Sequence, residues 1–373
     1  MSGVFSNQSL PAGPIIGITG DVGGAHGGGA GLLRGANRFG GADFFMALAA
    51  RCGAGMILLM LGALILVLAM AAVPSVKTFG LKFLVTSSWR PNERTVVQRD
   101  ANGNIVRDAD GDPVTDTLPA QFGALPVIYG TLVSSALALL VAVPLSFGAA
   151  IFLVRIAPRW HMGWLMGIVS FLIEFLAAIP SIAYGIWGLF VLAPLLQDHL
   201  EAPLNSFFGW FAPLRFLHTQ DATTGRDMLC AGLILGIMIL PIITAISRDV
   251  LKSVPRAQVE GTLALGATWW QSCIAMLRYA RSGLFGAVML GLARAAGETM
   301  AVAMVIGNAT RISSSLFAPA QTMSSLLANE FAEASSDIHR SSLIQVALIL
   351  LVMSLLFNVV ARYLVVGKQV ARA

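Results

Sequence analysis

Long, uninterrupted runs of apolar residues dominate the hydrophobic pattern of this chain. A helix that crosses a bilayer needs about 20 apolar residues, which is much longer than an ordinary strand. The uncharged runs of about this length are 54–73, 127–154, 229–247 and 343–361. A further run, 283–307, has this length but contains Arg294 and Glu298. The pattern therefore predicts an all-α, polytopic membrane protein.

The apolar stretch 162–196 is longer than one span and is interrupted at Pro180. Two full spans would have to turn at Pro180 and Ser181, which is too tight for two full-length helices. The alternative is a single span preceded by a lead-in helix at the membrane interface. The first interpretation gives seven spans in the chain and the second gives six.

The distribution of basic residues favours six spans. With six, thirteen Lys and Arg residues lie on one side of the membrane and four on the other. The long loop 74–125 adds six bases to the second side, but six acids match them. Because Lys and Arg accumulate in cytoplasmic loops, and seven spans would place the most basic loop outside, we expect six spans with both termini in the cytoplasm.

Composition divides the rest of the chain. The glycine-rich start has too few large apolar side chains to offset its ordering entropy, so we predict a disordered cytoplasmic leader. Two glycine-centred turns predict a hairpin at 92–119, inside the first outside loop. The predicted segments are the leader 1–52, a first transmembrane helix 53–73, a periplasmic loop 74–125, a membrane core 126–366 containing a cytoplasmic loop 248–282, and a cytoplasmic tail 367–373.

Composition and motifs exclude several classes of function. The 373 residues are 56% apolar and 12% charged, against about 25% charged in an average soluble protein, so a soluble enzyme is excluded. The net charge of +5 is too weak to indicate a nucleic-acid partner. The chain has no P-loop, HExxH helix or GxSxG elbow, and its three cysteines form no CxxC motif. We therefore expect no catalytic site, no cofactor and no metal site.

The loop 248–282 is too basic and too amphipathic to be a simple connector. The sequence predicts a helix from Ala257, a turn at Gly266, and a second helix that begins with Trp269 and Trp270. A short helix on the cytoplasmic face suits the groove of a partner protein. The alternative is an interfacial helix anchored by its tryptophans.

Two opposite charges interrupt the apolar run 283–307. Arg294 is the twelfth of its 25 residues, which predicts a place near the bilayer midplane, and Glu298 follows one turn later on the same helical face. Each unpaired charge there costs about 2.5–3.5 kcal/mol, so both must face a protein interior or a water-filled path. Either they neutralise each other as a packing pair, or they mark a substrate path. The planar guanidinium fork of arginine suits a tetrahedral oxyanion.

The segments EGTLALG (260–266) and GLARAAGETMAVAMVIGN (291–308) resemble the membrane permease subunits of ATP-binding-cassette importers, and specifically the PstC family of phosphate importers. The likeness extends to FGALPVIYGTLVSS, AAIPSIAYGIWGLFVLAP and SLFAPAQTMSSLLANEFAEA. It covers about residues 54–366 except most of the hairpin at 92–119, which is interpreted as an insertion. Where the family usually has Glu-Ala-Ala, this chain has Glu260, Gly261 and Thr262.

The resemblance implies the six-helix, MetI-like permease fold, in a bacterial inner (cytoplasmic) membrane, for half of the translocation path of an ATP-driven inorganic phosphate importer. It also implies a heterodimer with a PstA-like permease, a dimer of PstB-like ATPase subunits that hydrolyse ATP, and a periplasmic phosphate-binding protein. Membrane lipid surrounds such a subunit, and no nucleic acid is involved.

The family assigns two groups of residues in this chain. Glu260, Thr262, Gly266 and Ala267 mark the loop that couples to the ATPase, while Arg294 and Glu298 mark the substrate path. The alternatives are a permease for another oxyanion, such as sulfate or molybdate, and a secondary transporter or channel. Inverted repeats would favour a secondary transporter, and no convincing internal duplication is found.

Overall fold

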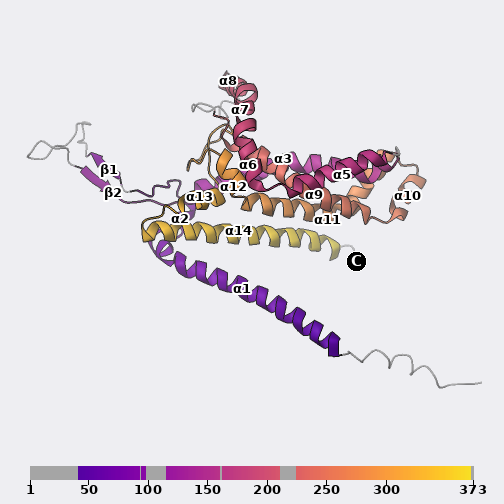
Figure 1. The fold of residues 1–373 in the computed structure, drawn as a ribbon, viewed down its shortest axis with the longest axis horizontal. Helices are drawn as coiled ribbons and strands as arrows, with labels where there is room; N and C mark the ends of the chain where they lie inside the picture. The colour runs from indigo at the N-terminus through magenta and orange to yellow at the C-terminus, as the bar shows by residue number, and fades with distance from the viewer. Residues whose placement is uncertain (1–40, 93, 98–114, 160–161, 211–223, 371–373) are drawn as a thin grey trace, which may run out of the picture. The chain divides into compact units, whose positions relative to one another are not determined.

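The computed structural model describes residues 41–92, 94–97, 115–159, 162–210 and 224–370. Within them, six helices are long and apolar enough to cross a membrane (Figure 1). They are Phe44–Phe79, Leu125–Arg159, Ser181–Phe207, Met228–Lys252, Trp269–Gly297 and Asp337–Val360. The predicted all-α, six-span architecture is confirmed.

The first helix, α1 (Gly41–Phe79), is longer than the predicted span 53–73. It includes residues 41–52, so their assignment to a disordered leader is wrong. The physical reason is that the helix-forming apolar sequence already begins before Arg51, with Phe44, Met46 and Leu48 interspersed with alanines. The prediction for residues 1–40 lies outside the described residues.

The chain divides into two compact units, Met1–Gly62 and Ala63–Ala373, and the second contains all of the predicted site residues.

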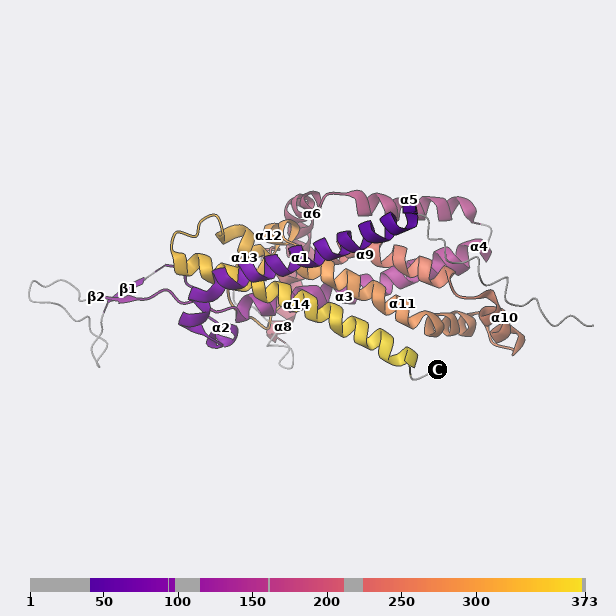
Figure 2. The ribbon, with the colours of Figure 1, turned by 90° about the horizontal axis from the view of Figure 1, so that it is seen from below.

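Three helices form the centre of this second unit: α3 (Leu125–Ile151), α9 (Met228–Lys252) and α11 (Trp269–Gly297). They lie side by side in Figures 1 and 2, and α9 packs against both of the others. Glycine permits the close approach, because a Cβ on Gly232 would lie 2.5 Å from Leu137 and a Cβ on Gly291 would lie 2.6 Å from Ile243. Small residues at helix contacts are typical of membrane bundles.

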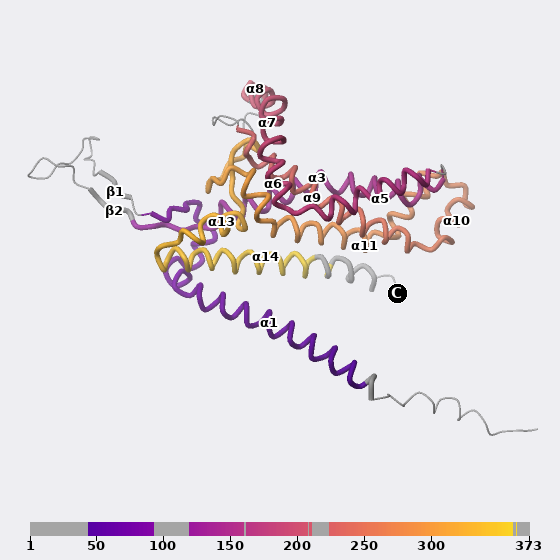
Figure 3. The backbone as a smooth tube through the Cα atoms, viewed as in Figure 1, coloured from indigo at the N-terminus to yellow at the C-terminus, as the bar shows by residue number. Residues whose placement is uncertain are grey.

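The stretch 162–196 contains one span with a lead-in helix, as the distribution of basic residues predicts. Helix α5 (Gly163–Ala178) ends at Ile179, which has an extended backbone before Pro180. The chain then continues as one helical stretch away from the central bundle (Figure 3). The Tyr184 hydroxyl donates to the Leu176 carbonyl at 2.8 Å and so ties the two sides of the break together. The helical stretch after Pro180 comprises α6 (Ser181–Trp187), α7 (Ala193–Leu196) and α8 (Ala202–Trp210). They are joined by the π-helical turns Gly188–Leu192 and Gln197–Glu201.

A two-stranded hairpin stands in the first loop, after the short helix α2 (Lys82–Val85). Strand β1 (Arg94–Val97) pairs antiparallel with β2 (Thr115–Leu118), and both strands lie inside the predicted hairpin segment 92–119. Residues 98–114 between them lie outside the described part of the chain.

The base of the hairpin is fixed to α13 (Met323–Glu330) and α14 (Asp337–Val370). The Trp89 indole Nε1 donates to Glu330 Oε2 at 2.8 Å, and His339 Nε2 lies 3.1 Å from the same oxygen. Phe122 lies with its ring centroid 5.0 Å from that of Trp89 and 5.3 Å from that of His339. These contacts join segments that are far apart in the sequence. Helix α14 also includes Gly367 to Val370, so most of the predicted tail 367–373 is helical.

Candidate translocation path and coupling loop

The predicted helix, turn and helix between the fourth and fifth spans are present. Helix α10 (Arg256–Ala264) ends before Gly266, whose φ of +85° lies in the left-handed region that favours glycine. Thr268 then caps α11: its hydroxyl accepts from Gln271 N at 3.3 Å, and Gln271 Oε1 accepts from Thr268 N at 2.7 Å.

The loop is shorter than the predicted 248–282. Helix α9 continues to Lys252, and α11 runs from Trp269 to Gly297 without a break, so the non-spanning segment is 253–268. The second helix that the sequence predicts is therefore the start of the fifth span rather than a separate element. The capping box at Thr268 sets its first residue, and Arg278 belongs to the helix itself.

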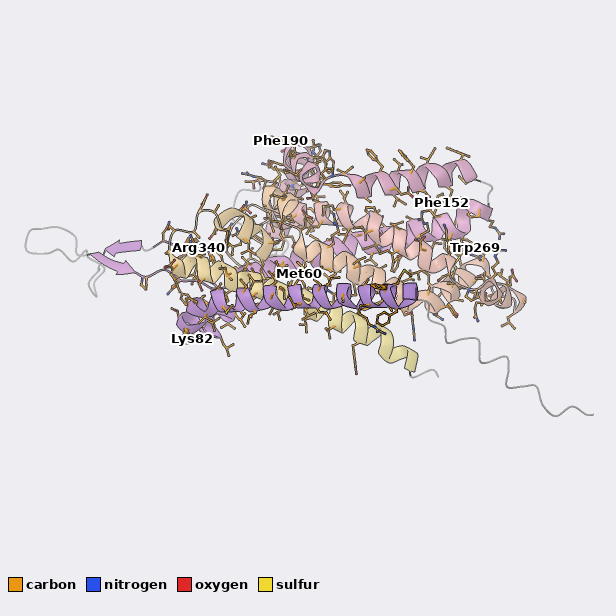
Figure 4. All side chains as sticks on the ribbon, turned by 60° about the horizontal axis from the view of Figure 1, so that its bottom comes forward. Met60, Lys82, Phe152, Phe190, Trp269 and Arg340 are labelled. Carbon is orange, nitrogen blue, oxygen red and sulfur yellow. The ribbon has the colours of Figure 1, made fainter. Side chains whose placement is uncertain are left out.

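Most of α10 faces away from the protein. None of its residues is buried, Glu260 is exposed, and the half-buried Thr262 donates its hydroxyl to the Val259 carbonyl at 2.7 Å. Beyond α10, Leu265 is 90% exposed and Trp270 is 63% exposed. Figure 4 shows Trp269, the first residue of α11, at the same end of the bundle as Phe152. This end of the molecule thus presents a short helix and uncovered apolar tips.

Arg294 lies in the last turn of α11, and the predicted continuous helix 283–307 is not found. The helix ends at Gly297, and Glu298 has an extended backbone with ψ of 130°. Glu298 is therefore the C-cap of α11 rather than part of a continuing helix, and no ion pair joins it to Arg294 in the described part of the chain. Gly297 has low helix propensity, which explains the end at this point. A second short helix, α12 (Met300–Val305), follows the break.

The Arg294 side chain projects from a face of α11 that the described chain leaves uncovered. Gly286, Leu290, Arg294 and Gly297 are all exposed and recur at helical spacing. A Cβ on Gly286 or Gly297 would meet no atom within 4 Å. The opposite face is buried against α9. This arrangement leaves the guanidinium available to a ligand or to a partner subunit.

Two hydroxyl side chains near the break were not among the predicted site residues. Ser324, in the first turn of α13, donates its hydroxyl to the Glu298 carbonyl at 2.6 Å and so holds the end of α11. Thr299 follows Glu298, and both hydroxyl residues line a cavity of about 540 Å³ together with Gly297. Ser324 belongs to the sequence TMSS, which lies inside the stretch 315–334 that resembles the family. That resemblance did not indicate where this segment lies in the fold.

A pair of buried acids was also missed, because the two residues are distant in the sequence. Glu201 and Asp227 are both fully buried, and their carboxyl groups lie within hydrogen-bonding reach of each other. Glu201 Oε2 accepts from Gly225 N at 3.1 Å, and Asp227 Oδ1 accepts from Cys230 N at 2.9 Å. Burial raises the pKa of Asp227 to about 6, against the opposing effect of the hydrogen bond from Cys230.

This pair predicts that the protein loses stability as the pH rises. The folded protein binds the Asp227 proton more tightly than the unfolded chain does, so stability is highest below the ordinary pKa of 3.8 and falls as the pH rises to about 6. Asp227→Asn removes the charge, keeps a good N-cap for α9, and should raise the melting temperature at neutral pH.

The measurement is thermal unfolding of the purified protein in detergent at pH 5 and pH 7.5. Asp249→Asn is the matched control, because Asp249 is an exposed acid on the same helix. We expect a smaller pH dependence for Asp227→Asn and an unchanged one for Asp249→Asn. An unaltered pH dependence in Asp227→Asn would contradict the assignment.

The six-helix bundle, with an exposed loop that carries α10 and a broken helix that carries Arg294, defines a polytopic membrane protein. No group of three or more potential metal-ligating side chains occurs in the described residues. Residues 142–367 match the family described as the binding-protein-dependent transport system inner membrane component. The chain belongs to this family. It is therefore a multi-pass inner-membrane component of a transport system and not an enzyme.

Individual relatives are more specific. The chain is 42% identical over 328 residues to the phosphate transport system permease protein PstC of Mesorhizobium japonicum, covering 88% of this chain and 91% of the relative. It is 38% identical to the protein of the same name from Haemophilus influenzae, covering 84% and 90%. A chain of the inward-facing MetNI methionine transporter matches with 16% identity and a TM-score of 0.45, covering 66% of this chain and 94% of that one.

Proposed function

We propose that this chain is the permease subunit that forms half of the inorganic phosphate path of an ATP-driven importer. The observation that carries the proposal is the position of Arg294, a permanently charged fork on an uncovered face of α11 beside a break in the helix. The names of the relatives supply the substrate class, because those proteins are phosphate transport permeases.

The chemistry of the path follows from these groups. The Arg294 guanidinium offers charge-assisted hydrogen bonds to a phosphate oxyanion, and such bonds are stronger than those of neutral donors. Thr299 and Ser324 lie beyond the end of the helix, where the Ser324 hydroxyl donates to the Glu298 carbonyl and so fixes the backbone near Arg294. Glu298, which is half-buried and negatively charged when ionised, would limit how long an anion stays. Transport then requires two states that expose this region to opposite sides of the membrane.

The partners complete the path and supply the energy. A PstA-like subunit would cover the open face of α11, and a PstB-like ATPase dimer would bind α10 and the tips at Leu265 and Trp270. Glu260, Thr262, Gly266 and Ala267 belong to this coupling loop. A periplasmic phosphate-binding protein would deliver the substrate from the other side. The chain contains no P-loop, which fits hydrolysis of ATP on a separate subunit.

The proposed orientation places both termini and α10 in the cytoplasm. It can be tested with single cysteines in a Cys52→Ser background, because the two remaining cysteines are buried. Thr224→Cys and Ser336→Cys should react with an impermeant maleimide added to intact cells, whereas Leu265→Cys should react only after permeabilisation. All three positions are exposed in the structure. Labelling of position 265 in sealed cells would overturn the orientation.

The function is tested by uptake of radiolabelled phosphate in a strain that lacks the gene. We expect uptake from micromolar phosphate to be lost and to return with the wild-type chain. A tenfold excess of sulfate or molybdate should not compete. If sulfate or molybdate competed, and if the deletion left phosphate uptake unchanged, the substrate would be another oxyanion and not phosphate.

A further inference from the structure

A second cationic site lies away from Arg294, at the end of the bundle that carries α10. A cavity of about 420 Å³ opens between the end of the second span, the end of α9 and the side of α10. Three basic side chains line it, one from each of these elements: Arg155, Lys252 and Arg256. Glu260 is its one acidic lining residue, so the cavity has a net charge of two positive. Figure 2 shows α4 (Ala157–Arg159), just beyond Arg155, at the same end of the bundle as α10.

The bases are not neutralised by the protein. No ion pair joins Glu260 to any of the three in the described part of the chain. Arg155 Nε is buried and has no hydrogen-bond partner. Leaving a buried polar group unsatisfied costs about 1–3 kcal/mol, and more when the group is charged. Such a group has an unused donor that a ligand entering the cavity can engage.

The position of the cavity gives its occupant a structural consequence. Helix α10 has no buried residue of its own and touches the bundle through the partly buried Val259, which packs against a small cluster that includes Val254 and Met276. An anion held between Arg155 and Arg256 would connect α10 to the second span. Lys252 would connect the same anion to the end of α9. The coupling loop would then be held more rigidly against the bundle.

We propose that this cavity binds a phosphate-bearing anion, either inorganic phosphate or the head group of an anionic phospholipid. Two guanidinium forks and one ammonium match the tetrahedral oxygens and the negative charge of a phosphate group better than those of a single carboxylate. Both sources are present where the cavity opens, at the cytoplasmic surface of the membrane. The inference relies on the proposed function only for this orientation. Binding itself does not depend on transport.

The test measures binding to the full-length chain, with Arg294→Gln as the background so that the proposed path does not contribute. The protein is purified in detergent, and its thermal stability is followed while inorganic phosphate is added. In parallel, native mass spectrometry follows retention of phosphatidylglycerol against phosphatidylcholine. We expect either saturable stabilisation by phosphate or selective retention of phosphatidylglycerol. The first result would identify inorganic phosphate as the bound anion, and the second would identify a lipid head group.

The variants separate the site from general charge effects. Arg155→Gln should weaken the binding about tenfold or more, which corresponds to the loss of one charge-assisted interaction. Lys252→Gln is a second variant at an exposed position and should weaken binding even if Arg155→Gln fails to fold. Arg159→Gln is the matched control, because Arg159 is an exposed arginine one turn further along and does not line the cavity. Absence of both kinds of binding, or equal binding by Lys252→Gln and Arg159→Gln, would overturn the proposal.

Discussion

Replacing Arg294 with Gln should lower phosphate uptake by about tenfold or more while the protein still assembles in the membrane. The expected size follows from losing a charge-assisted hydrogen bond to the anion, worth about 1.5–3 kcal/mol. Assembly should survive because Arg294 is exposed and has no ion-pair partner among the described residues. Arg294→Lys keeps the charge but loses the fork. Partial activity of this variant would indicate attraction by charge, and near-complete loss would indicate recognition of shape.

Two further variants make this prediction discriminating. Arg281→Gln removes an exposed arginine from the middle of the same helix, and should leave uptake close to wild type. The double variant Arg294→Gln with Glu298→Gln tests mutual neutralisation. If the two charges served only each other, the double variant would transport normally. Normal phosphate uptake by that protein, at equal membrane levels, would remove Arg294 from the path.

Gly266→Val should abolish most ATP-driven uptake although the chain still inserts. Gly266 has a φ of +85°, which a β-branched residue adopts only with strain. The turn that presents α10 would therefore change. Space is not the limit, because a Cβ at this position would meet no atom within 4 Å. Gly266→Asn should accordingly retain more uptake than Gly266→Val, since asparagine tolerates the left-handed region.

The control for the turn is another glycine in the same loop. Gly261 lies inside α10 with open space around it, so Gly261→Ala should favour the helix by about 0.5–1 kcal/mol without loss of uptake. The measurements are phosphate uptake and co-purification of the ATPase subunit. Equal uptake by the Gly266→Val and Gly261→Ala proteins would show that the conformation of this turn does not matter for coupling.

The sequence predicted the features that depend on local chemistry. The runs of apolar residues and the placement of basic residues were sufficient to predict six spans, because the bilayer constrains both directly. The turn at Gly266 and the helix start at Trp269 were also predicted, and the structure shows that both are local, since Gly266 has a positive φ and Thr268 caps the helix.

Features that depend on packing were not predicted. The apolar run 283–307 did not predict that α11 ends at Gly297, because a glycine is common inside a membrane-spanning helix and because the Ser324 hydroxyl also holds the break from outside. The same limit applies to the Glu201 and Asp227 pair, which only the folded chain brings together. The cationic cavity is a further case, since Arg155 and Arg256 are distant in the sequence. Residue spacing along one helix carries no information about such contacts.

The most direct test of the phosphate importer assignment is transport by purified components. The chain would be reconstituted in proteoliposomes with the proposed sister permease and the proposed ATPase, and the proposed phosphate-binding protein would be supplied, loaded with phosphate, on the periplasmic side. We expect phosphate to accumulate across the membrane only with ATP on the α10 side, and sulfate not to accumulate. Accumulation without ATP, or of sulfate in preference to phosphate, would contradict the assignment.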